Sequence, residues 1–147
     1  MSERLMLRLG AIAALLASIV LSQIVFVQSV FAQSAPPQNL LSQGKTAIAS
    51  TQEGGLTAAM AFDGNTGTRW GSNFSDPQWV LVDLGAVATI NRVVLNWEAA
   101  YGKAYQIQVS TNGTSWTTLY STTTSDGGID DINLNGSGRD LRMSGST

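Results

Sequence analysis

The sequence contains neither cysteine nor histidine among its 147 residues. Without cysteine, the chain has no disulfide framework and no thiolate metal site. Without histidine, it lacks the commonest general base, the usual zinc ligand and every Ser-His or Cys-His catalytic pair. The absence of histidine is the strongest argument from composition against an enzyme.

Charged residues are also scarce, at 12% of the chain. From Gln33 onward there are six Lys or Arg residues against nine Asp or Glu residues. A surface that binds nucleic acid or anionic lipid needs a stripe of basic side chains. The charge balance therefore predicts no nucleic-acid partner.

The first 32 residues are predicted to be a signal peptide rather than part of the fold. Two arginines lie within Met1–Arg8, Leu9–Ala32 is almost wholly apolar or small, and Ala32 offers a small residue at the cleavage site. An uncleaved membrane anchor is the alternative, because the apolar stretch approaches the roughly 20 residues that span a bilayer. Residues 33–38 contain two consecutive prolines and form an expected linker, which leaves 39–147 as the folded domain. We expect a protein that is secreted or held in the cell envelope, without a membrane partner after cleavage.

Short segments rich in β-branched and aromatic residues recur after residue 39, between clusters of Gly, Asn, Asp and Ser. Breaks are expected at Gly85 and at 136–138, and Asn112-Gly113 predicts a type I′ hairpin turn, which requires positive φ at both central residues. The pattern predicts an all-β sandwich or jelly roll. The expected strand residues are Val80, Val82 and Leu84; Val93, Leu95 and Trp97; Tyr105, Ile107 and Val109; Trp116 and Leu119; Ile132 and Leu134; and Leu141 and Met143.

One loop gathers oxygen-bearing side chains. Asp63, Asn65 and Thr68 lie close together, and Gly64 between the first two lets the backbone fold tightly. Ca²⁺ is held by such oxygens from carboxylates, amides and backbone carbonyls. The alternative is an Asx turn, in which Asp63 and Asn65 bond to their own backbone.

Three ordered motifs resemble one known family: AFDGNTGTRW at 61–70, DPQWVLVDLG at 76–85 and WEAAYGKAYQIQVSTNGTSW at 97–116. They are similar to the discoidin, or F5/8 type C, domains, and most similar to the bacterial carbohydrate-binding module family 32. The resemblance implies a galactose-binding-like jelly-roll β-sandwich with a structural calcium site. Carried over to this sequence, it implies Asp63, Asn65, Thr68 and the carbonyl of Met60 as calcium ligands.

The resemblance is incomplete at the C-terminal side. In the family, a further loop and a final strand follow the segment that corresponds to residues 138–145, and that strand supplies a glutamate to the cation. The sequence stops at Thr147. We therefore expect a C-terminally truncated domain with weakened calcium binding.

A sugar site combines an aromatic surface with a few polar groups that bond hydroxyls. Val93, Leu95 and Trp97 are expected to face inward, so the alternation along the strand points Glu98 away from the core. There Glu98 either accepts hydrogen bonds from a ligand or pairs with Lys103. In the resembling modules, ligands bind among the loops at one end of the sandwich, which adds Glu53. The further candidates in these loops are Arg69, Asn73, Phe74 and Tyr101.

Several of these residues have simpler interpretations. The alternative for Arg69 is that it braces the cation loop, and Trp70, Trp79 and Trp116 are expected in the core. The acidic stretch 126–131 is either a second metal loop or, as we expect, a solvated turn.

The sequence thus predicts a non-catalytic carbohydrate-binding module that tethers a secreted protein to a polysaccharide. Two glutamates among few cations favour glucosamine-containing polymers, with β-glucan as the other candidate ligand. The alternative is an adhesive or lipid-binding discoidin-type domain, disfavoured because the loop tips are mostly Gly, Ser, Asn and Asp. A glycoside hydrolase with two carboxylates is a third hypothesis without a supporting motif. We expect a monomer.

Overall fold

The computed structural model describes residues 40–146. The predicted signal peptide and linker lie outside this part of the chain. Its elements are β1 (Thr46–Ala49), the 3-10 helix η1 (Ala58–Ala61), β2 (Gln78–Asn96), β3 (Ala104–Ser110), β4 (Thr117–Thr122) and β5 (Ile129–Ser146). The predicted all-β fold is confirmed. Within residues 40–146, no helix is long and apolar enough to span a membrane.

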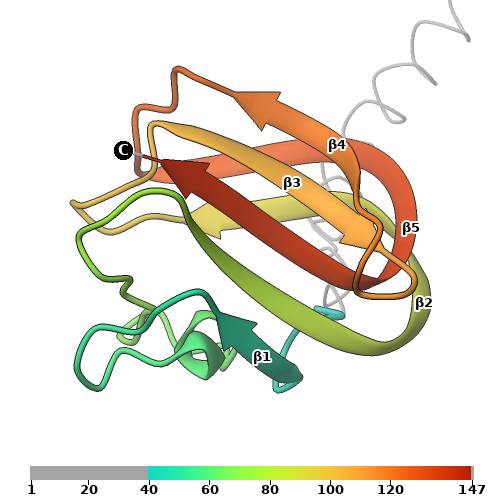
Figure 1. The fold of residues 1–147 in the computed structure, drawn as a ribbon, viewed down its shortest axis with the longest axis horizontal. Coiled ribbons are helices and arrows are strands. Elements are labelled where there is room, and N and C mark those ends of the chain that lie inside the picture. The colour runs from blue at the N-terminus through green and yellow to red at the C-terminus, as the bar shows by residue number, and fades with distance from the viewer. Residues whose placement is uncertain (1–39, 147) are drawn as a thin grey trace, which may run out of the picture. The chain divides into compact units, whose positions relative to one another are not determined.

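The strands form one antiparallel sheet in the order β1-β2-β5-β3-β4. β2 and β5 are long, and both bend, so that the second half of β2 and the first half of β5 form a layer behind the other strands (Figure 1). The ladder between them is interrupted between Asp83 and Ala88, where Gly85 has a φ of +87°. The predicted break at Gly85 is therefore wrong: the strand turns there and continues, because β5 bends beside it and pairing resumes at Ala88 and Gly138.

The core lies between these two layers. Val82, Leu84, Ile90 and Val109 form one buried cluster. Tyr105, Ile107 and Ile132 form the other, against which Trp97 packs. These clusters confirm the predicted alternation, and burial of a side chain such as Ile107 contributes about 1.5–3 kcal/mol.

Trp79 and Trp116 do not belong to the buried clusters, contrary to the prediction. Trp79 alternates with the buried Val80 and pairs across the ladder with Ser144, so it faces outward. Trp116 lies under the guanidinium of Arg142, whose Cζ is 4.0 Å from the ring centroid. A large aromatic residue is thus covered by a cation on the outer face rather than by the core.

The loop between β3 and β4 is not the predicted type I′ turn. Gly113 has a φ of +72°, but no residue other than glycine has positive φ in the described part of the chain. Instead, the Asn112 Oδ1 accepts hydrogen bonds from the amides of Thr114 and Ser115, at 3.0 and 2.8 Å. The Asn112 side chain therefore closes a longer loop over residues 111–116.

Candidate functional site

The candidate binding residues lie among loops at one end of the domain. Gln78 at the start of β2 pairs with Gly145 near the end of β5, and Ala104 at the start of β3 pairs with Ser146. The connections that meet at this end, which we call the loop end, are 50–57, 71–77, 97–103 and 123–128 (Figure 1, at the left).

Loops 50–57 and 71–77 are bonded to each other. The amide of Glu53 donates to the carbonyl of Gly71 at 2.8 Å, and the amide of Asn73 donates to the Thr51 Oγ1 at 3.0 Å. The Glu53 and Asn73 side chains are exposed. Phe74 is 94% exposed, so an aromatic ring is displayed beside these polar groups.

Loop 97–103 presents the second carboxylate. Glu98 is exposed, and its Oε2 accepts a hydrogen bond from the amide of Ala100 at 3.0 Å. Among the described residues it forms no ion pair with Lys103, so that alternative is not what the structure shows. Tyr101 is half-buried, and its ring lies against Gly127, where an added Cβ would come within 2.8 Å of it.

Arg69 leads into the same group of loops. The next residue, Trp70, donates from its indole to the carbonyl of Thr51 at 2.9 Å. The Arg69 side chain is exposed and forms no ion pair within the described residues. It therefore does not brace the cation loop, and it lies next to the chain that carries Asn73 and Phe74.

Sequence reasoning missed Asp130, which it assigned to a solvated turn. Its Oδ2 accepts hydrogen bonds from Trp97 Nε1 at 2.7 Å, Tyr105 Oη at 2.8 Å and Ser125 Oγ at 3.0 Å. Burial raises the pKa of Asp130, but these donors outweigh it and the net pKa is lowered. The sequence signal that could have found it is the strand alternation, because Asp130 lies two residues before the buried Ile132 and so shares its inward face.

The neighbouring carboxylate, Asp131, lies in β5 and faces solvent, as predicted for its side chain. It accepts two hydrogen bonds of 2.7 Å from Arg92, whose guanidinium lowers its pKa. Within residues 40–146, no group of three or more His, Cys, Asp or Glu side chains could hold a metal ion. Residues 126–128 connect β4 to β5, and Asp130 and Asp131 already belong to β5.

The predicted calcium loop brings its oxygens together. The Thr68 Oγ1 lies 2.7 Å from the Asp63 Oδ2 and 2.9 Å from the Asn65 carbonyl oxygen. The Asp63 Oδ1 also accepts the amide of Asn65 at 2.7 Å, which is the Asx turn of the alternative interpretation. Hydrogen bonds from Thr68 and Asn65 lower the pKa of Asp63.

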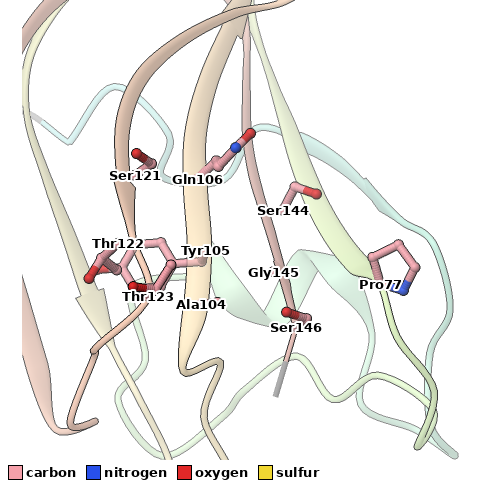
Figure 2. A pocket seen from close by; sticks show the side chains of 10 residues that line it. All are labelled: Pro77, Ala104, Tyr105, Gln106, Ser121, Thr122, Thr123, Ser144, Gly145 and Ser146. Carbon is pink, nitrogen blue, oxygen red and sulfur yellow. The ribbon is translucent and has the colours of Figure 1, made fainter.

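A shallow groove lies elsewhere on the loop end, on the outer face of β5, β3 and β4 (Figure 2). Gln106 pairs with both Ser144 and Ser121, and these side chains form a polar row in the groove. The volume of the groove is about 420 Å³. None of the predicted sugar-binding residues lines it, although Pro77 at its edge follows the loop of Phe74.

A family model described as F5/8 type C, NedA-like, galactose-binding domain matches residues 60–143. The chain belongs to this family. The predicted resemblance is therefore confirmed, as is the galactose-binding-like fold. The family 32 carbohydrate-binding module of C. perfringens NanJ, solved with galactose, shares the fold at 22% identity, with a TM-score of 0.61 over 69% of this chain and 82% of that chain.

More similar solved structures come from the chitosanase/glucanase of Paenibacillus sp. IK-5. Its chitosan-binding module 1 is 52% identical, with a TM-score of 0.70 over 73% of this chain and 86% of that chain. Its chitosan-binding module 2, solved with chitotriose, is 43% identical, with a TM-score of 0.71 over 74% of this chain and 88% of that chain.

A curated relative is the polysaccharide lyase 8 family protein HylA of Enterococcus faecalis (strain ATCC 700802 / V583). The two sequences are 40% identical over 68 residues, which is 46% of this chain and 5% of the enterococcal protein. The chain thus spans a small part of the length of this relative.

Proposed function

We propose that the loop end binds a glucosamine-containing polysaccharide and that the domain is non-catalytic. The general prediction of a carbohydrate-binding module is confirmed by the family and by the solved relatives. The observation that carries the finer proposal is the display of Glu53, Glu98 and Phe74 at one end of the domain.

The chemistry of these groups suits a polymer of glucosamine. An exposed carboxylate pairs with an ammonium group, and an aromatic ring covers the C–H face of a sugar. Asn73 and Arg69 supply further polar groups for hydroxyls. The 52% identity to a chitosan-binding module supports the same ligand class.

The exposure of the two carboxylates suits a binding surface. Glu53 and Glu98 lie on separate exposed loops, where each can meet an ammonium group of a polymer. We infer that the module tethers an extracellular protein to its polysaccharide.

Calcium is the proposed structural cofactor. The Thr68 hydroxyl lies within 2.9 Å of a carboxylate oxygen of Asp63 and of the carbonyl oxygen of Asn65, so three kinds of oxygen meet in this loop. An oxygen-only donor set of this kind fits Ca²⁺. Asp63, Asn65, Thr68 and the Met60 carbonyl would hold the ion, which would stabilise the loop that leads to Arg69 and Trp70.

Calorimetric titration tests the ligand class. We expect the protein to bind chitotriose more tightly than N,N′,N″-triacetylchitotriose or a β-glucan trisaccharide, because only the first carries ammonium groups. Glu53→Gln and Glu98→Gln should each weaken chitotriose binding by about two- to fivefold, as for exposed ion pairs. Equal binding of all three sugars would refute the glucosamine assignment, and binding to lipid vesicles without any sugar binding would favour the adhesive alternative.

A further inference from the structure

The Asp130 carboxylate connects the two loops that meet around Glu98. Its three donors come from three elements: Trp97 follows β2, Tyr105 lies in β3 and Ser125 lies in the turn before β5. All three bonds end on the same oxygen, Oδ2. A carboxylate forms such bonds more strongly than a neutral amide, because the acceptor is charged.

The surrounding contacts fix loop 97–103 at both ends. The Trp97 amide donates to the Gly128 carbonyl at 2.7 Å, and the Ser125 amide donates to the Lys103 carbonyl at 3.0 Å. The Trp97 and Tyr105 rings also pack at a centroid distance of 5.4 Å. Glu98 is therefore the next residue after Trp97, whose side chain is hydrogen-bonded to Asp130.

The Asp130 side chain points inward rather than toward a ligand. It is half-buried and shares the inward parity of Ile132, whereas its exposed neighbour Asp131 pairs with Arg92. The pKa of Asp130 is lowered against the effect of burial, which fits a carboxylate that stays ionised among these donors.

We propose that Asp130 is a positioning residue that sets the orientation of Glu98 and Tyr101 for ligand binding, by holding Trp97 and the 125–128 turn on one carboxylate oxygen. The inference rests on the proposed function of the loop end. It adds a residue that does not touch the sugar but determines how strongly Glu98 contributes.

A double-mutant cycle tests this role. Asp130→Asn should weaken chitotriose binding about as much as Glu98→Gln does, about two- to fivefold, in the otherwise unchanged protein and in Glu53→Gln. In Glu98→Gln it should have little further effect, because coupled residues are not additive. Asp131→Asn is the matched control, since it removes the same charge one residue away, and it should leave affinity nearly unchanged. An equal loss from Asp130→Asn in all three backgrounds would overturn the proposal.

Two further measurements keep the test decisive. If Asp130→Asn fails to fold, Ser125→Ala and Trp97→Phe each remove one donor without a change of charge, and each should show the same dependence on Glu98. Amide hydrogen exchange of residues 97–103 should be faster in Asp130→Asn than in Asp131→Asn, even if chitotriose does not bind. Unchanged exchange would overturn the positioning role, whereas absence of chitotriose binding by the unmodified protein would overturn the proposed ligand.

Discussion

Arg139 and Asp83 form a bidentate ion pair beside the bend of the two long strands. The Nε and Nη2 atoms of Arg139 each lie 2.8 Å from an oxygen of Asp83. Asp83 Oδ1 also accepts the amide of Gly85 at 2.7 Å. The pair thus joins β5 to β2 at the position where β2 turns.

This pair predicts a specific acid sensitivity. The Arg139 hydrogen bonds, and then the Gly85 amide, lower the pKa of Asp83 from 3.8 to about 2. Because the folded pKa lies below the unfolded one, the stabilisation is present above about pH 4 and is lost as the pH falls toward 2. Urea midpoints measured from pH 2 to 6 should fall less steeply in Asp83→Asn. Arg139→Met should show the same flattening, and a slope like that of the unmodified protein would contradict this account.

Phe74 is expected to contribute to binding and not to stability. Since the ring is 94% exposed, Phe74→Ala removes almost no buried surface. We expect chitotriose affinity to fall about three- to tenfold, with an unchanged thermal midpoint. Val87→Ala provides the control, because Val87 is an apolar residue at the bend that is 59% exposed. Equal affinities of Phe74→Ala and the unmodified protein would remove the ring from the site.

Calcium should stabilise the domain through the 63–68 loop. At saturating Ca²⁺ we expect the thermal midpoint to rise by about 4 °C, and EGTA should reverse the rise. Asp63→Ala and Thr68→Val should abolish the shift, whereas Asp126→Asn in the other acidic turn should retain it. A midpoint that does not respond to Ca²⁺ in the unmodified protein would exclude the cation.

Two adjacent glycines offer a test of how Tyr101 is supported. Gly127 and Gly128 have φ values of +79° and +71°, so alanine should cost about 1–2 kcal/mol of stability at either position. Only at Gly127 would the new Cβ meet the Tyr101 ring, whereas nothing lies within 4 Å at Gly128. We expect weaker chitotriose binding in Gly127→Ala than in Gly128→Ala. Similar affinities in the two variants would show that Tyr101 does not act through this contact.

The strands were predictable where one face is buried. Val80, Val82 and Leu84 alternate with outward residues, and the structure places all three in the interior. The same parity rule, applied to Trp79, gives its outward position, which the predicted core assignment of this residue did not take into account.

The site was predictable only in its exposed parts. Glu53 and Phe74 could be proposed from the sequence, because the family resemblance indicates which loops bind ligands, and the structure shows that both side chains are exposed. Asp130 could not, since its three donors come from residues 97, 105 and 125, which only the tertiary fold brings together. The bend at Gly85 was missed for a similar reason, because the partner strand β5 decides whether pairing resumes.

The position of β5 has a consequence for how the domain forms. β5 follows every other described strand in the sequence, yet it lies between β2 and β3 in the sheet. Before it is synthesised, the chain can pair only β1 with β2 and β3 with β4, and the cluster around Ile107 lacks Ile132. A nascent chain should therefore remain open until its last described strand leaves the ribosome, and then close in a single cooperative step with slow, long-range pairing.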